Sequence, residues 1–122
     1  MSRMKVVALL LALGSLGFAS AAYAHAQLDH AVPAVGAEVA APSELLLAFT
    51  EGVEPKFSSV TLTSASGEKE PLGPLGVDPA NPAIVVVKVT KTLPPGVYTV
   101  NWKATSVDTH KTQGSYAFTV KP

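Results

Sequence analysis

The 122-residue sequence contains no cysteine. Disulfides, thiolate zinc sites, iron–sulfur clusters and blue-copper centres are therefore excluded, because each of them needs a cysteine sulfur. Methionine is almost as scarce, since the only two are Met1 and Met4 at the N-terminus. Any metal site in the rest of the chain must consequently be built from nitrogen and oxygen ligands.

An excess of either charge is also missing, because nine basic side chains balance nine acidic ones at neutral pH. Such a chain shows no basic footprint for nucleic acid or for an anionic membrane. The apolar run at residues 6–13 is shorter than the roughly 18 residues that a membrane-spanning helix requires, and no later segment approaches that length. We therefore expect no nucleic-acid partner and no insertion into a membrane.

Residues 1–24 have the pattern of a secretory signal peptide. Two basic residues precede the apolar run, and Ala22-Tyr23-Ala24 then fits the A-x-A cleavage pattern. Residues 19–21 and 24–26 fit the same pattern, so neighbouring cleavage positions stay open. Cleavage after Ala24 predicts an exported protein that comprises residues 25–122 and begins with His25.

Beyond residue 24, short apolar runs alternate with proline or glycine, and no segment shows a capped 3.6-residue repeat. This pattern favours strands over helices. Strands are expected at residues 27–32, 45–49, 60–63, 84–89, 97–104 and 115–120. The first is expected at a sheet edge, and the strand at 84–89 is expected to be buried on both sides. Residues 34–42 and 71–82 are expected to form loops, and Gly114 a bend.

The strand patterns also indicate the core. Leu45, Leu47 and Phe49 share one face of their strand, and inward faces follow at alternate positions 98–104 and 116–120, which include Trp102. Six or seven short strands in the 98 residues of 25–122 predict a single all-β domain, a Greek-key antiparallel β-sandwich.

The best metal ligands are Asp108 and His110, because alternate side chains of extended backbone point to the same side. An N-terminal His25 would add two nitrogens, since its α-amine and imidazole Nδ1 can close a six-membered chelate ring on a metal. Three nitrogens and one carboxylate oxygen in a tetragonal plane suit Cu(II). The sequence therefore predicts one Cu(II) per monomer, provided that the first strand begins at the end of the sandwich that carries Asp108.

Together these segments resemble the CopC family of periplasmic copper-resistance proteins. The motifs that carry the resemblance are His25-Ala26-x-Leu28, Phe49-Thr50-Glu51, Pro95-Gly96-x-Tyr98-x-Val100-x-Trp102, Ser106-x-Asp108-x-His110 and Gly114-Ser115-x-x-Phe118-x-Val120. The resemblance implies a cupredoxin-like, more broadly immunoglobulin-like, sandwich that binds Cu(II) through His25, Asp108 and His110. It also implies a monomeric copper carrier, not an enzyme, that works beside an inner-membrane copper permease or another periplasmic copper protein.

One departure from the family pattern is informative. Some members carry a second, methionine-rich Cu(I) site, but both methionines here precede residue 25, so the resemblance points to the Cu(II)-only type. Glu51 falls where the family suggests a carboxylate that hydrogen-bonds the metal ligands. A surface acid beside Gly52 is the alternative for this residue. His30 is not expected to be a ligand, because an extended strand places it on the face opposite His25.

Two other functions stay open. An N-terminal histidine with a second histidine is also the core of the histidine brace in copper-dependent polysaccharide monooxygenases. That chemistry needs an open equatorial position, which Asp108 would fill here. The other possibility is a structural β-sandwich without metal, in which Asp108 only forms a turn and His110 is a solvated loop residue.

Overall fold

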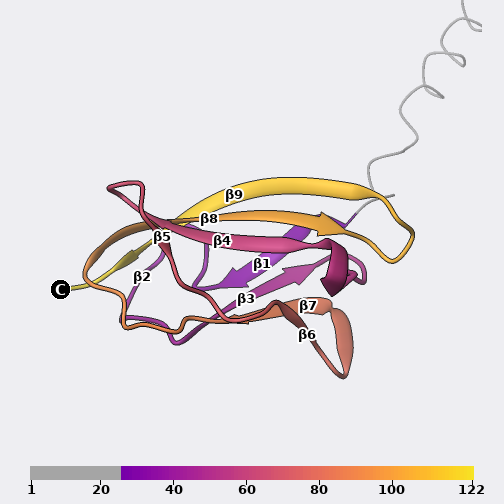
Figure 1. The fold of residues 1–122 in the computed structure, drawn as a ribbon, viewed down its shortest axis with the longest axis horizontal. Coiled ribbons are helices and arrows are strands. Elements are labelled where there is room, and N and C mark those ends of the chain that lie inside the picture. The colour runs from indigo at the N-terminus through magenta and orange to yellow at the C-terminus, as the bar shows by residue number, and fades with distance from the viewer. Residues whose placement is uncertain (1–25) are drawn as a thin grey trace, which may run out of the picture.

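The computed structural model describes residues 26–122, which form two β-sheets packed face to face (Figure 1). The predicted signal peptide and His25 lie outside the described residues. The elements are β1 (Leu28–Val32), β2 (Glu38–Val39), β3 (Glu44–Phe49), the 3-10 helix η2 (Pro55–Phe57), β4 (Ser59–Ser64), β5 (Lys69–Glu70), β6 (Gly76–Asp78), β7 (Asn81–Lys88), β8 (Gly96–Thr105) and β9 (Lys111–Val120). No helix among them is long and apolar enough to cross a membrane.

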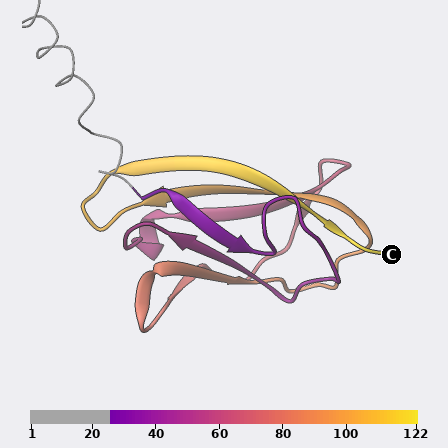
Figure 2. The same cartoon turned by 180° about the vertical axis from the view of Figure 1, so that it is seen from behind.

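The strands divide into a four-stranded sheet with the order β1-β3-β7-β6 and a five-stranded sheet with the order β2-β9-β8-β4-β5. All neighbouring strands are antiparallel except β2 and β9, which are parallel. The chain changes sheets five times, at the connections β1 to β2, β2 to β3, β3 to β4, β5 to β6 and β7 to β8. In the view from behind, the indigo β1 lies at an edge, next to the yellow β9 of the other sheet (Figure 2). The predicted all-β sandwich and the edge position of the first strand are confirmed.

Three expectations about individual strands and loops were wrong in detail. The segments 34–42 and 71–82 are not entirely loops, because they contain the short strands β2 and β6. Two or three residues show no usable periodicity, and long-range pairing with β9 and β7 makes them strands. The strand at 84–89 is buried on one face only: Val85 and Val87 are buried, whereas Ile84 and Val86 are half-buried. No further layer covers the outer face of this sheet in the described part of the chain.

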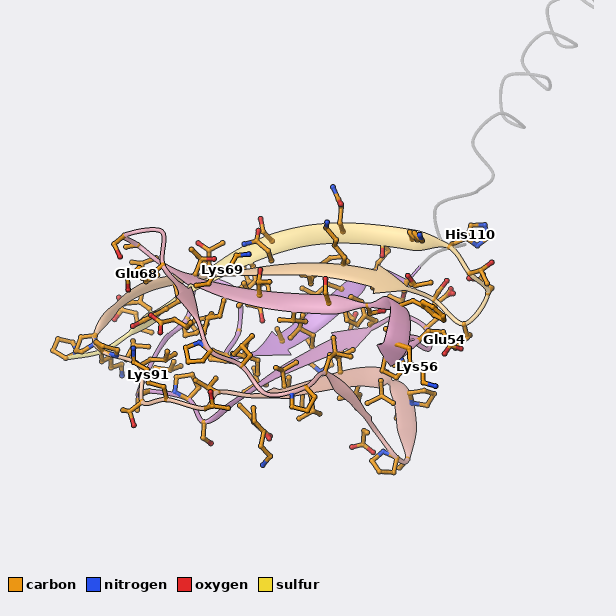
Figure 3. The ribbon with its side chains drawn as sticks, viewed as in Figure 1. Glu54, Lys56, Glu68, Lys69, Lys91 and His110 are labelled. Atoms are coloured by element: carbon orange, nitrogen blue, oxygen red, sulfur yellow. The ribbon has the colours of Figure 1, made fainter. Side chains whose placement is uncertain are left out.

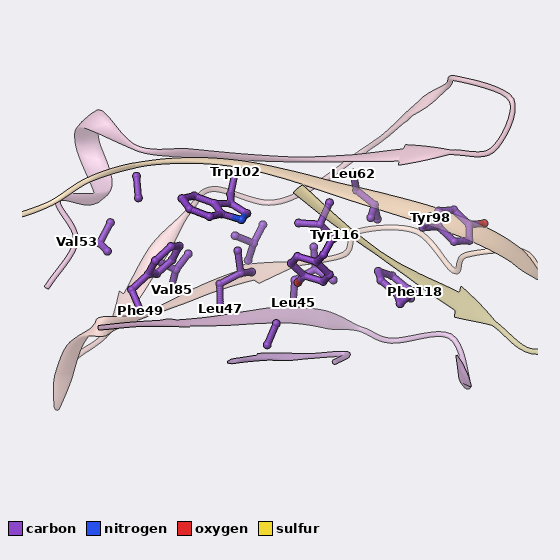
Figure 4. Close-up of a cluster of buried hydrophobic side chains, with 14 of the residues drawn as sticks. Leu45, Leu47, Phe49, Val53, Leu62, Val85, Tyr98, Trp102, Tyr116 and Phe118 are labelled. Carbon is purple, nitrogen blue, oxygen red and sulfur yellow. The ribbon is translucent and has the colours of Figure 1, made fainter. Parts of the chain in front are cut away.

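The core fills the space between the sheets and includes every side chain predicted for it, together with others that were not predicted, such as Val53 and Leu93 (Figure 4). Trp102 meets Phe49 of the opposite sheet edge to face, with ring centroids 5.1 Å apart and an interplanar angle of 76°. Tyr98 stacks on Phe118 at 5.9 Å, and its hydroxyl donates a hydrogen bond of 2.6 Å to the Pro94 carbonyl oxygen. Aromatic pairs of this kind stabilise by roughly 0.5–1.5 kcal/mol beyond their buried area.

Gly114 does not form the expected bend. It lies within β9, directly opposite Trp102 of β8. A Cβ atom at this position would lie 2.6 Å from Cζ2 of Trp102, so the indole ring covers the place where another residue would carry its side chain. The glycine is required by a side-chain contact across the strands and not by backbone conformation.

Gly114→Ala should therefore lower the free energy of unfolding by about 1–3 kcal/mol, the usual cost of overpacking a core. The measurement is urea denaturation followed by the fluorescence of Trp102, the only tryptophan. Gly76→Ala is the matched control, because no atom lies within 4 Å of the added methyl group in that strand. Equal stability of the two variants would contradict this account of Gly114.

Tyr116 provides a second stability test. Its hydroxyl is buried and has no hydrogen-bond partner among the described residues. Burial raises the pKa of Tyr116 from 10.0 to about 12. Because the unfolded chain loses this proton at lower pH than the folded one, the contribution of the neutral hydroxyl is intact below pH 10.0 and is lost as pH rises toward about 12.

Tyr116→Phe should remove this part of the alkaline loss of stability. Near neutral pH the variant should match or exceed the parent by up to about 1 kcal/mol, because no hydrogen bond is lost. Urea unfolding at neutral and at alkaline pH measures both effects. Tyr98→Phe is the control, and since its hydroxyl is hydrogen-bonded, it should be less stable than the parent by about 1 kcal/mol at neutral pH. A Tyr116→Phe variant as unstable as the control would refute the assignment.

Candidate metal centre

Asp108 and His110 lie in the turn between β8 and β9, at one end of the sandwich (Figure 3). The turn is closed by backbone hydrogen bonds from Ser106 N–H to the His110 carbonyl oxygen and from Thr109 N–H to the Ser106 carbonyl oxygen, both 2.8 Å. Thr109 has a φ of 72°, in the left-handed region that only a tight turn demands of such a residue. The hairpin thus presents both candidate ligands at its tip.

The structure brings the two side chains together, as the sequence predicts. Oδ1 of Asp108 lies 3.3 Å from Nδ1 of His110, and both side chains are about half exposed, at 48% and 54%. The physical reason differs from the expected one, because Asp108 and Thr109 lie in a turn and not in extended backbone. The left-handed conformation of Thr109 reverses the chain between the two ligands.

Ser106 organises this turn from its buried side. It is fully buried, and its hydroxyl donates a hydrogen bond to the Asp108 carboxylate. The same oxygen accepts the backbone N–H of His110 at 3.2 Å. One buried hydroxyl therefore contacts both residues that the sequence proposes as ligands. No role was predicted for Ser106 from the sequence, although it is the first residue of the Ser106-x-Asp108-x-His110 motif.

The hydrogen bond from Ser106 is also the main reason why the pKa of Asp108 lies below its ordinary value of 3.8, and hydrogen bonds and charge from His110 lower it further. The carboxylate is therefore ionised at all pH values near neutrality. An ionised carboxylate next to an imidazole gives one oxygen and one nitrogen donor for a divalent metal.

The first described residues enter the sandwich at this same end. Ala26 is fully buried, and its carbonyl oxygen accepts a hydrogen bond of 2.7 Å from the hydroxyl of Thr112, two residues after His110. Gln27 exchanges hydrogen bonds with Thr50, from its N–H to the Thr50 hydroxyl at 2.9 Å and from Thr50 N–H to its carbonyl oxygen at 2.8 Å. The geometric condition for a site that includes the start of β1 is thus met up to Ala26.

The segment after β3 supports the turn from its other side. The carbonyl oxygen of Gly52 accepts a hydrogen bond of 3.0 Å from the N–H of Val107, and Val53 forms a β-bridge with Ser106. A Cβ atom on Gly52 would approach Cγ1 of Val107 to 3.1 Å, so the close contact favours glycine. Glu51 is half-buried and immediately precedes this contact. Its predicted role beside the metal ligands stays a prediction.

His30 is not brought to the candidate site. Its Nδ1 lies 2.8 Å from the carboxylate of its neighbour Asp29, on an exposed part of β1. Residues 26–122 contain no group of three or more histidine, aspartate or glutamate side chains arranged to hold a metal ion. Within the described residues, the candidate site therefore consists of the pair Asp108–His110.

The fold and the hairpin define the class, which is a cupredoxin-like β-sandwich with a histidine–carboxylate pair at one end. The family model described as the CopC domain matches residues 28–121, and the chain belongs to this family. Protein YobA of Escherichia coli strain K12 is 42% identical over 100 residues, which cover 81% of each chain. Copper resistance protein C of Escherichia coli is 38% identical over 112 residues, 87% of this chain and 89% of that one.

A solved structure agrees with these relatives. The crystal structure of PcoC, titled a methionine-rich copper resistance protein from Escherichia coli, has a TM-score of 0.73 and 37% identity, and the match covers 80% of this chain and all of that one. A copper-related resistance function follows for this protein from its family and relatives.

Ser106→Ala should raise the pKa of Asp108 toward 3.8, because the hydrogen bond that lowers it most is removed. A group with a depressed folded pKa stabilises the fold above its unfolded pKa, and that stabilisation is lost as pH falls through the folded value. Ser106→Ala should lose the stabilisation that comes from the lowered pKa of Asp108. An NMR titration of the carboxyl carbon of Asp108 in the metal-free protein measures the pKa directly.

Ser115→Ala, at an exposed position of β9, is the matched control and should leave the titration of Asp108 unchanged. If Ser106→Ala also leaves it unchanged, Ser106 does not organise the turn.

Proposed function

We propose that this protein is a periplasmic Cu(II) carrier that takes part in copper resistance. It binds one Cu(II) per monomer through the α-amine and imidazole of His25, the carboxylate of Asp108 and the imidazole of His110. The observation that carries the proposal is the turn between β8 and β9, where Ser106 holds an ionised carboxylate beside an imidazole, next to the point at which Ala26 enters the fold.

The chemistry of the donors supports Cu(II) over Cu(I). Amine, imidazole and carboxylate groups are the borderline and hard ligands that Cu(II) accepts, whereas Cu(I) prefers thioether and thiolate sulfur. Residues 25–122 contain neither methionine nor cysteine. This chain therefore differs from the relative whose structure is titled methionine rich, and a second site of the thioether type cannot form within it.

Transport of the ion fits the donor set better than oxidation chemistry. Four protein donors in one plane leave no equatorial position for an oxygen species, and Asp108 is the donor that closes it. The partner is then a copper-handling protein, either an inner-membrane permease or another periplasmic copper protein. Glu51 is proposed to orient a metal-bound nitrogen ligand through a hydrogen bond, since its segment is hydrogen-bonded to the site turn.

Mass spectrometry of the exported protein tests the proposal in one experiment. The expected result is a chain that begins at His25 and gains the mass of one copper ion with one equivalent of Cu(II). His110→Ala and Asp108→Asn should weaken binding, each by removing one donor. Tight copper binding by a chain that starts at Ala22 or Gln27 would contradict the chelate.

The free α-amine provides a sharper prediction. An extra Met or Gly before His25 separates the amine from the imidazole and opens the chelate ring, although all three side chains remain. The loss of Cu(II) affinity should be similar to that of His110→Ala and far larger than that of His30→Ala, the matched histidine control. Affinity of the native form should weaken as pH falls through roughly 8 to 5, because protons compete for the amine and imidazoles.

The measurement is a competition titration of the extended and native forms at several pH values. Equal affinity of the two forms would show that the amine is not a ligand, and the histidine-brace assignment would then be wrong.

A further inference from the structure

Phe57 is the most exposed large hydrophobic side chain in the described structure, with 70% of its surface accessible. It belongs to η2, which follows the segment that supports the metal turn. Figure 3 shows that Glu54, which precedes η2, and Lys56, which belongs to it, lie at the same end of the sandwich as His110. Burial in the core does not explain this ring, because most of its surface is accessible to water.

The backbone that carries this ring is held firmly. The hydroxyl of Thr105 donates to the Phe57 carbonyl oxygen at 2.7 Å. Ser58 continues the clamp, since its hydroxyl donates to the Glu54 carbonyl oxygen at 2.8 Å and accepts the N–H of Thr105 at 2.9 Å. Because this backbone is already ordered, a partner that covers the ring has to immobilise only one aromatic side chain, which keeps the entropic cost of binding low.

A polar hollow lies beside Phe57 on the outer face of the five-stranded sheet. It is lined by Lys103, Lys111, Thr112 and Gln113, and no acidic residue contributes to it. Neither lysine forms an ion pair with any other residue of 26–122. The hollow is therefore positive, although residues 25–122 carry seven lysines against nine acidic side chains.

The hollow adjoins the hairpin turn that carries the candidate metal centre. Lys111 directly follows His110, and Thr112 holds Ala26. Of the other exposed large hydrophobics, Val107 lies in the turn between β8 and β9 itself, whereas Val97 near the start of β8 and Val32 at the end of β1 lie toward the other end of the sandwich. The aromatic ring and the two unpaired lysines thus coincide with the end at which the ion would be exchanged.

From this arrangement we propose that Phe57, Lys103 and Lys111, here called the Phe57 face, dock a copper-exchanging protein whose surface places carboxylates around an apolar pocket. The proposal rests on the function proposed above. The ring would fill the pocket, and the lysines would pair with the carboxylates, which orients the metal turn toward the partner.

Charge excludes the two other natural occupants. A second copy of the chain in a two-fold dimer would place the lysines of one Phe57 face against those of the other, since a two-fold interface is self-complementary. Recognition of an anionic membrane typically uses clusters of about four to eight basic residues, whereas the Phe57 face with the neighbouring Lys56 offers three. A protein with an acidic surface is the occupant that the observations favour.

The test is photo-crosslinking in the cells that produce the protein, with p-benzoylphenylalanine in place of Phe57. The matched control carries the same group in place of Val97, which is 48% exposed at the opposite end. We expect one discrete product at position 57 and none at position 97. The double variant Lys103→Glu/Lys111→Glu should reduce its yield about tenfold, whereas Lys88→Glu/Lys121→Glu, which reverses two exposed lysines elsewhere, should not.

The crosslinked protein is then identified by mass spectrometry and purified, and its binding to this chain is measured with Phe57→Ala and with the two double variants. The proposal is supported if Phe57→Ala and Lys103→Glu/Lys111→Glu weaken binding and Lys88→Glu/Lys121→Glu does not. The proposal would be overturned by a crosslinked product of twice the chain's mass or by the absence of any product. It would also be overturned if Lys103→Glu/Lys111→Glu left the crosslink yield unchanged. Binding to phosphatidylglycerol vesicles that the lysine reversal abolishes would also overturn it and would assign the face to a membrane.

Cu(II) titration of the same variants separates the two proposals. None of the three residues is a proposed ligand, so affinity should stay within about threefold of the parent at physiological salt, where exposed charges are screened. A parent chain that binds no Cu(II) but forms the crosslink would disprove the carrier function and leave the docking face standing. Unchanged Cu(II) binding without a crosslink would disprove the docking face alone.

Discussion

The antiparallel pairing of β8 with β9 is the interaction on which the rest of the structure depends. It runs over ten residue pairs, from Gly96 opposite Val120 to Thr105 opposite Lys111. Its inner face supplies the aromatic half of the core, including Trp102 and Phe118, and its outer face carries the lysines of the Phe57 face. Its turn carries Asp108 and His110. A register error in this hairpin would therefore disrupt the core and the candidate site together.

Burial of Ser106 is the feature that positions the two side chains of the candidate site. A hydroxyl with no exposed surface must satisfy its hydrogen-bonding capacity within the protein, and here its partners are the carboxylate of Asp108 and the backbone of His110. The candidate ligands stay half exposed and accessible to an ion, while the group that positions them is protected from water. This division between a buried support and an exposed ligand pair is the usual way in which outer contacts tune a metal site.

Long-range contacts gather at the same end of the sandwich. Thr112 binds the backbone of Ala26 across 86 positions of sequence, and Thr105 binds η2 across 48. These contacts bring the start of the described chain, the metal turn and the Phe57 face onto one surface. The proposed carrier function would benefit from such an arrangement, because the proposed docking residues and the proposed ligands would then face the partner together.

The amino-acid sequence by itself determined the fold class, the edge position of β1, the core residues and the pair Asp108–His110. Alternating apolar positions and a two-residue ligand spacing are local patterns, and they can be recognised without knowledge of the tertiary structure. Its family resemblance also anticipated the CopC domain that matches residues 28–121.

Only the tertiary structure decided the rest. The short strands β2 and β6 exist because distant strands pair with them, and Gly114 is required because the ring of Trp102 lies over it. The ligand pair converges through a left-handed Thr109 and a buried Ser106, which no local pattern reveals. Each of these features depends on contacts between residues that fold into proximity, and a local pattern contains no record of which distant residue will arrive beside it.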